Sequence, residues 1–211
     1  MVKIKTEVIK ESDKSIRKAI IILKKGGLVV FPTETAYGIA ADATSSRAIK
    51  KIYEVKKRSR EKSVSIIVSS LKMMARSGII TKEIRYLVKE FMPGPLTLVI
   101  KKKNSLPQIL SREGVAFRIP SNKNALRIIR IFGKPITATS ANLSGQPPLY
   151  KTDEVIKTFD GKVEMILDGG NLKIIRPSTI VSFLDNNKPK ILRKGSISNT
   201  KILRKLQKFK K

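Results

Sequence analysis

The 211-residue sequence contains no cysteine, no histidine and no tryptophan. Without cysteine, the chain cannot form disulfides, use a thiol nucleophile or bind a metal through sulfur. Without histidine, it cannot build a Ser-His-Asp triad, and no imidazole can act as a base or as a zinc ligand. Any catalysis must therefore use carboxylates, lysine, hydroxyl groups, a metal held by ligand oxygens, or the positioning of reactants alone.

Acidic side chains are scarce, because 16 Asp and Glu residues face 45 Lys and Arg residues, for a formal net charge of +29. One explanation is the composition of a lysine-rich heat-adapted protein, but such chains usually gain glutamate as well. The other explanation, which we favour, is a polyanionic partner such as RNA or nucleotide phosphate. Aromatic residues make up only 5% of the chain, which favours attraction to a nucleic-acid backbone over a base-stacking platform.

A signal peptide and an apolar run long enough to cross a bilayer are also lacking, so we expect a cytoplasmic protein with no membrane partner. The length and the 41% hydrophobic content fit one large domain, alone or with a tail. The chain after Asp185 has ten basic residues and no acidic one. We therefore predict a domain over residues 1–200, followed by a basic helix or partly frayed tail over residues 201–211.

Hydrophobic spacing and turn residues predict helices and strands that alternate along the chain. Helices are expected over residues 13–25, 45–55, 71–76, 82–91 and 124–131. Strands are expected over residues 28–31, 64–68, 96–100, 115–119, 135–139, 164–167, 179–183 and 190–192. This pattern indicates a single α/β domain with a twisted, mostly mixed β-sheet and flanking helices.

Two segments could carry chemistry. Residues 137–145 place small hydroxyl and amide groups directly after a strand, where they could hydrogen-bond a ligand or simply form a capped turn. Residues 56–62 hold five cations in seven positions, which suits a phosphate clamp or a solvated helix end. No Walker-type glycine loop is present, so a P-loop fold is not expected.

Arg118 ends an apolar strand, where a guanidinium is costly to desolvate without an anion. Its partner is either a structural carboxylate or the carboxylate or phosphate of a ligand. Residues 33–35 and 177–179 place hydroxyls at strand boundaries, where capping is the simpler explanation. Tyr37 is expected to be a core residue with a satisfied hydroxyl, and Asp168-Gly169-Gly170 to be a tight turn.

Taken in order, these segments resemble those of the YrdC-like threonylcarbamoyl-adenylate synthases. The matching motifs, which span roughly residues 12 to 200, are Pro32-Thr33-Glu34-Thr35-Ala36-Tyr37-Gly38, Lys56-Lys57-Arg58, Pro93-Gly94-Pro95-Leu96-Thr97, Ala116-Phe117-Arg118-Ile119-Pro120, Thr139-Ser140-Ala141-Asn142-Leu143-Ser144-Gly145, Asp168-Gly169-Gly170, Pro177-Ser178-Thr179 and Ile191-Leu192-Arg193-Lys194-Gly195. Two positions depart from the family pattern: Ser59 stands for the usual proline and Ala36 for the common valine.

The resemblance implies a single-domain enzyme with the YrdC-like fold. Such nucleotidyltransferases condense L-threonine, bicarbonate or CO2 and ATP into threonylcarbamoyl-AMP and release pyrophosphate. A separate transfer complex then passes the threonylcarbamoyl group to tRNA. Mg2+ is expected to be bound mainly through ATP, with no metal site made by the protein itself.

The resemblance also implies roles for individual residues. The implied catalytic tetrad is Lys56, Arg58, Ser140 and Asn142. The implied threonine-binding residues are Thr35, Arg118, Ala138 and Ser178. The implied ATP-binding residues are Arg58, Lys62, Gly114, Ser140, Asn142, Pro148 and Arg193. The alternatives are a carbamoyl-adenylate-forming relative and a non-catalytic RNA-binding module that uses the same basic surface.

Overall fold

Two mixed β-sheets form the centre of the computed structural model, which describes residues 4–186 and 188–209. Sheet A has five strands, in the spatial order β1 (Glu7–Lys10), β9 (Met165–Asp168), β2 (Val29–Pro32), β3 (Tyr37–Ala40) and β8 (Thr139–Ser140). Sheet B has six strands, in the order β11 (Lys190–Arg193), β10 (Thr179–Ser182), β5 (Leu96–Lys101), β6 (Gly114–Arg118), β4 (Ile66–Ile67) and β7 (Ile136–Thr137). The predicted single-domain α/β class with mixed strand directions is confirmed, although the sequence did not indicate that the strands divide between two sheets.

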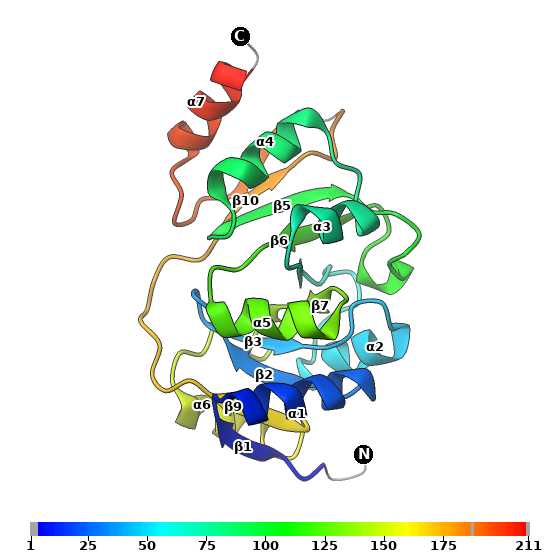
Figure 1. The fold of residues 1–211 in the computed structure, drawn as a ribbon, viewed down its shortest axis with the longest axis vertical. Coiled ribbons are helices and arrows are strands. Elements are labelled where there is room, and N and C mark those ends of the chain that lie inside the picture. The colour runs from blue at the N-terminus through cyan, green and yellow to red at the C-terminus, as the bar shows by residue number, and fades with distance from the viewer. Residues whose placement is uncertain (1–3, 187, 210–211) are drawn as a thin grey trace.

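Helices pack around these sheets (Figure 1). They are α1 (Asp13–Lys24), α2 (Ser46–Val55), α3 (Leu71–Ser77), α4 (Lys82–Phe91), α5 (Lys123–Phe132), α6 (Thr152–Phe159), α7 (Asn199–Phe209) and the short 3-10 helix η1 (Gln108–Leu110). Each of the five predicted helices has a counterpart whose ends lie within one residue of the expected ones. No helix in the described part of the chain has both the length and the apolar character that a membrane crossing needs.

Local sequence explains where the helices begin and end. The α5 helix begins at Asn122, whose side-chain oxygen accepts a hydrogen bond of 2.9 Å from the backbone N–H of Ala125. It ends at Gly133, whose φ of 77° lies in the left-handed region that glycine tolerates. Its buried residues, Ile128 and Ile129 among them, line the face that packs inward.

The two sheets meet at a segment that was predicted to be one strand over residues 135–139. The structure divides it into β7 in sheet B and β8 in sheet A. The Thr137 hydroxyl accepts from the backbone N–H of Ala41 and donates to the carbonyl of Ile39, both at 2.9 Å. Ala138 lies between the two strands, and its N–H donates to the carbonyl of Ser65 at 2.9 Å. Ala138 therefore lies at the junction of the sheets.

Where the sequence left a basic helix or a frayed tail open over residues 201–211, the structure has a helix that begins at Asn199 and reaches Phe209, while residues 210 and 211 lie outside the described residues. This helix, α7, packs on α4 at one end of the molecule (Figure 1). Its Ile202 and Leu206 are buried, and the ring of Phe209 stacks on that of Tyr86 with centroids 5.0 Å apart. An ion pair between Lys205 and Glu90 joins the same two helices.

Candidate active site

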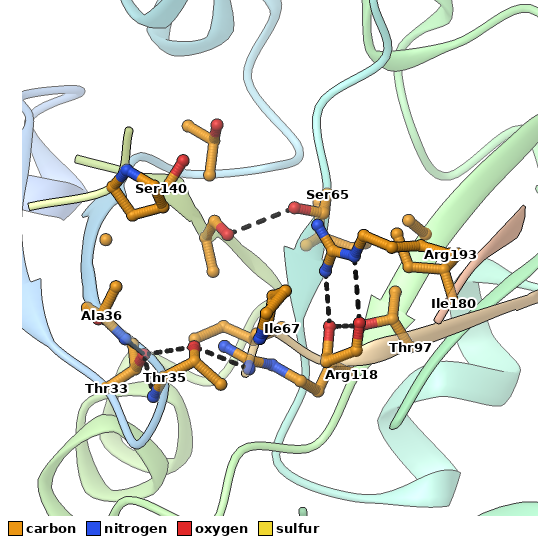
Figure 2. Close-up of a pocket in the computed structure, with 18 of the residues that line it drawn as sticks. Thr33, Thr35, Ala36, Ser65, Ile67, Thr97, Arg118, Ser140, Ile180 and Arg193 are labelled. Carbon is orange, nitrogen blue, oxygen red and sulfur yellow. Dashed lines mark hydrogen bonds between the residues drawn. The ribbon is translucent and has the colours of Figure 1, made fainter. Parts of the chain in front are cut away.

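A cavity of about 410 Å³ lies where sheet A faces sheet B (Figure 2). Its walls come from the β2–β3 turn, the segment before β4, strands β5, β6 and β10, the β7–β8 junction and the end of β11. The polar side chains on these walls are hydroxyls and arginines, and no carboxylate lines the cavity among the described residues. Such a surface favours anionic ligands that accept hydrogen bonds.

Arg118, the last residue of β6, is held on one wall. It is only 8% exposed, and its Nη1 donates to the Thr35 hydroxyl at 3.1 Å. The same nitrogen lies 3.3 Å from Oε1 of Glu34, so the structure supplies the carboxylate partner that the sequence left open. Burial lowers the pKa of Arg118, and the negative charge of Glu34 opposes this shift.

Arg193 and Ser178 form a second polar group on the sheet B side. Arg193 donates from Nε to the Ser178 carbonyl and from Nη2 to the Ser178 hydroxyl, both at 3.0 Å. The Ser178 and Thr97 hydroxyl oxygens are 2.7 Å apart. A side chain on Gly195 would lie 2.3 Å from the Pro177 carbonyl, so only glycine allows the segment after β11 to pass this close. Burial, followed by the charge of Arg118, lowers the pKa of Arg193.

Arg58 lies in the turn that follows α2. Its Nε donates to the Lys62 carbonyl at 3.2 Å, and its Nη2 donates to the Ser63 carbonyl at 2.8 Å. Lys57 has a φ of 48°, in the left-handed region, which turns the chain sharply between Lys56 and Arg58. Burial lowers the pKa of Arg58, which has only neutral hydrogen-bond partners.

Lys56 lies behind the cavity wall rather than on it. The side chain is 1% exposed, and its Nζ donates to the Ser140 carbonyl at 2.5 Å, the Asn142 carbonyl at 2.6 Å and the Asn142 Oδ1 at 3.0 Å. The Ser140 hydroxyl also donates to Asn142 Oδ1, at 2.6 Å. Burial, followed by the charge of Arg58, lowers the pKa of Lys56 to about 7. Lys56 therefore fixes the turn that presents Ser140 to the cavity.

Most of the site residues that the sequence predicts do come together. Those that line the cavity are Thr35, Arg58, Arg118, Ala138, Ser140, Pro148, Ser178 and Arg193. Lys56 and Asn142 contact Ser140 from behind the wall. The Lys62 carbonyl accepts from Arg58, whereas the Lys62 side chain does not line the cavity.

Gly114 is the predicted site residue that lies elsewhere. It lines a second hollow, of about 740 Å³, which also contains Arg60, Arg112 and Leu184 and shares Ser63 with the first cavity. A Cβ at Gly114 would lie 2.5 Å from a terminal methyl carbon of Leu184, so a side chain there would displace that of Leu184.

Other residues of the site were not predicted. Glu34 carried no predicted role, and Thr33, Ser65, Thr97, Tyr150 and Leu192 line the cavity as well. The adjacency of Glu34 to Thr35 in the 32–38 motif is the one signal that could have indicated it. Tyr37 is buried as expected, and its hydroxyl bonds Thr152 and the Gly169–Gly170 turn.

Metal ligands do not cluster in residues 4–186 and 188–209: no three His, Cys, Asp or Glu side chains come together there. Two mixed sheets around a cavity of arginines and hydroxyls define an α/β domain with a site for anionic ligands. Residues 21–195 match the Sua5_yciO_yrdC family model, whose description is "Telomere recombination". The chain belongs to this family.

Similar proteins agree with this assignment. The chain is 38% identical over 187 residues to the threonylcarbamoyl-AMP synthase of Pyrococcus abyssi. The aligned residues cover 86% of this chain and 54% of that protein. It is 33% identical over 208 residues to a putative threonylcarbamoyl-AMP synthase of Methanocaldococcus jannaschii, covering 95% of this chain and 99% of that protein.

The solved structure of P. abyssi Sua5 complexed with L-threonine superposes with a TM-score of 0.88 at 35% identity, over 96% of this chain and 60% of that one. The chain thus spans between a half and two thirds of the longer relatives that it matches.

Proposed function

We propose that this chain is an L-threonylcarbamoyladenylate synthase, a nucleotidyltransferase that joins L-threonine, bicarbonate or CO2 and ATP. The observation that carries the proposal is the single cavity that brings Arg118, Thr35 and Ser178 together with Arg58, Ser140 and Arg193. The names of the similar proteins, and the threonine in the P. abyssi complex, give the substrate class.

The chemistry fits a chain that lacks cysteine and histidine, because the nucleophile is made from the substrates. The amine of threonine attacks CO2 and loses a proton, which gives a carbamate. A carbamate oxygen then attacks the α-phosphorus of ATP, and pyrophosphate leaves as that P–O bond breaks. The protein has to align two anions and offset their repulsion, so charged hydrogen-bond donors are the groups it needs.

In this proposal, Arg118, Thr35, Ser178 and the backbone at Ala138 bind threonine. Arg118 suits the carboxylate because a guanidinium donates two parallel hydrogen bonds, a geometry that lysine does not provide. A buried position next to apolar strand residues also excludes water, which would hydrolyse the carbamate and the mixed anhydride.

Arg58, Arg193 and Ser140 bind ATP in this proposal, with Pro148 at the cavity edge. Lys56 and Asn142 support Ser140 through the hydrogen bonds described above. Gly114 would contact ATP where the nucleotide extends past Ser63 into the second hollow, and Lys62, the neighbour of Ser63 in the chain, would contact ATP from outside that hollow. Because the cavity wall offers hydroxyls rather than carboxylates, Mg2+ would be held mainly by ATP oxygens and water.

The product would serve tRNA modification in the cytoplasm, through a separate transfer complex. The net charge of +29 supports direct attraction to tRNA or other RNA as well.

The deciding experiment measures pyrophosphate release from purified protein with ATP and Mg2+. We expect release only when threonine and bicarbonate are both present. Release that needs bicarbonate but not threonine would indicate a different adenylate-forming activity. RNA binding without any pyrophosphate release would indicate a non-catalytic module.

A further inference from the structure

The three arginines that line the cavity differ in their electrostatic surroundings. Arg118 has a carboxylate partner, Glu34, at 3.3 Å. Arg58 and Arg193 donate only to neutral oxygens, those of Lys62, Ser63 and Ser178. No ion pair neutralises Arg58 or Arg193 within the described part of the chain. Arg118 and its partner are therefore close to neutral together, whereas Arg58 and Arg193 carry uncompensated positive charge, although Arg193 is near enough to Arg118 for the two charges to interact.

Glu34 is fixed behind Arg118 and does not line the cavity itself. Its Oε2 accepts from the backbone N–H of Asn122 at 3.4 Å, at the start of α5. Its Oε1 is buried and accepts no hydrogen bond from the described residues, so it acts on Arg118 through charge. The side chains of Glu34 and Arg118 are 15% and 9% exposed, which limits screening by solvent.

The hydrogen bonds of Arg118 follow the same division. Its Nη1 faces Thr35 and Glu34, as Figure 2 shows for the bond to Thr35. Its Nε and Nη2 make no hydrogen bond to the described residues, although the side chain lines the cavity. One nitrogen of the guanidinium is thus held by the protein, and two nitrogens, Nε and Nη2, remain to donate to a ligand carboxylate.

We propose that Glu34 is a positioning residue that gives the Arg118 part of the cavity its selectivity for a zwitterionic amino acid over a polyphosphate. This inference rests on the proposed function, since it assigns threonine and ATP to different parts of one cavity. A zwitterion has no net charge, so the neutral Arg118–Glu34 pair does not repel it. A polyphosphate carries several negative charges, so Glu34 repels it, and Arg58 and Arg193 attract it instead.

The test compares Glu34→Gln with the wild-type protein by equilibrium titration of L-threonine, with and without saturating pyrophosphate and without Mg2+. In the wild type, pyrophosphate should leave the threonine Kd unchanged. In Glu34→Gln, the charge beside Arg118 is lost, and pyrophosphate should raise the apparent threonine Kd at least about fivefold. Without pyrophosphate, the two threonine Kd values should agree within about threefold, because a zwitterion gains little from the change.

Glu164→Gln is the matched control. Glu164 is also a partly buried glutamate that accepts from a backbone N–H, that of Leu28 at 2.6 Å, and lies near a cation, Lys51, at 3.6 Å. It does not line the cavity, so pyrophosphate should not affect threonine binding in this variant.

The outcomes distinguish a failure of the proposed function from a failure of the role of Glu34. A folded wild type that does not bind threonine contradicts the proposed function. A wild type that binds threonine, with a folded Glu34→Gln variant that shows no competition or has lost threonine binding, overturns the role of Glu34 alone. If Glu34→Gln does not fold, the wild type still decides, because competition between pyrophosphate and threonine there would also overturn it.

Discussion

Lys56 places a titratable amine where the charged form is costly. Its pKa is lowered from the ordinary 10.5 to about 7, first by burial and then by Arg58. The unfolded chain therefore binds this proton more tightly than the folded chain does. Between these two pKa values, the stability of the folded state rises with pH, and below about pH 7 the full cost of the buried charge is present.

We predict that the free energy of unfolding of the wild type, relative to Lys56→Met, increases by about 2 kcal/mol from about pH 7 to about pH 9. Methionine has a similar length and does not titrate, so the difference isolates the amine. Denaturant unfolding of both proteins at several pH values measures it. A constant difference would mean that the three oxygen acceptors keep Lys56 charged throughout this range.

Arg58 tests the proposed phosphate contacts with little effect on the fold, because it donates only to carbonyls of its own turn. Arg58→Ala should reduce adenylate formation by roughly 2–4 kcal/mol in transition-state free energy, the usual cost of a lost charged contact. Arg47→Ala is the control, since Arg47 is an exposed arginine on α2 that lines neither hollow. Pyrophosphate release and melting temperature should be measured on both. Equal losses in the two variants would contradict a specific role for Arg58.

At the scale of elements, sequence patterns identified the helices and strands that have strong local signals, such as a capping residue or an apolar face. The helix over Lys82–Phe91 has a Thr81 cap and an apolar face, and its bounds were predicted fully. The α6 helix was missed, because its N-cap, Lys151, makes no side-chain capping bond. Strand β3 was missed because it is buried throughout and shows no alternation of polar and apolar residues.

Prediction of the site from the sequence was limited in the same way, by the lack of local signals. The resemblance of short motifs to a known family identified many of the residues that line the cavity, whereas local sequence alone favoured capping for the hydroxyls of residues 33–35 and 177–179. The burial of Lys56 and the pairing of Glu34 with Arg118 depend on segments far apart in the chain, which meet only when the two sheets pack. Charged side chains are usually exposed, so neither arrangement could be predicted from local spacing.

The α7 helix allows the proposed attraction to RNA to be tested at one element. Ile202 and Leu206 anchor it, while Arg204 and Lys208 are exposed. The double variant Arg204→Gln/Lys208→Gln should fold normally and keep adenylate formation. It should reduce the slope of log affinity for tRNA against log salt by roughly 1–2, about 0.7–0.9 for each lost phosphate contact.

The matched control removes the same charge from another helix, through Lys14→Gln/Lys24→Gln on α1. Titrations of tRNA at a series of KCl concentrations compare the slopes. If both double variants reduce the slope equally, overall charge rather than α7 accounts for the binding.

At the scale of the whole molecule, the charge imbalance affects the fold itself. Most ion pairs among the described residues have at least one exposed side chain, for example Lys151–Glu154, and exposed pairs contribute little to stability. The large excess of cations contributes repulsion that the folded state concentrates and the unfolded state relieves. Screening by salt should therefore remove more repulsion than attraction.

We predict that the melting temperature rises by about 2–6 °C when KCl increases from about 0.02 M to about 0.3 M, where the Debye length falls well below 10 Å. Chloride binding to the arginines of the cavity would produce a similar rise, so Arg58→Ala/Arg193→Ala serves as the control. Self-repulsion spread over the surface predicts that the rise persists in this variant, whereas local anion binding predicts that it disappears. A melting temperature that falls with salt would mean that the ion pairs outweigh the repulsion among the excess cations.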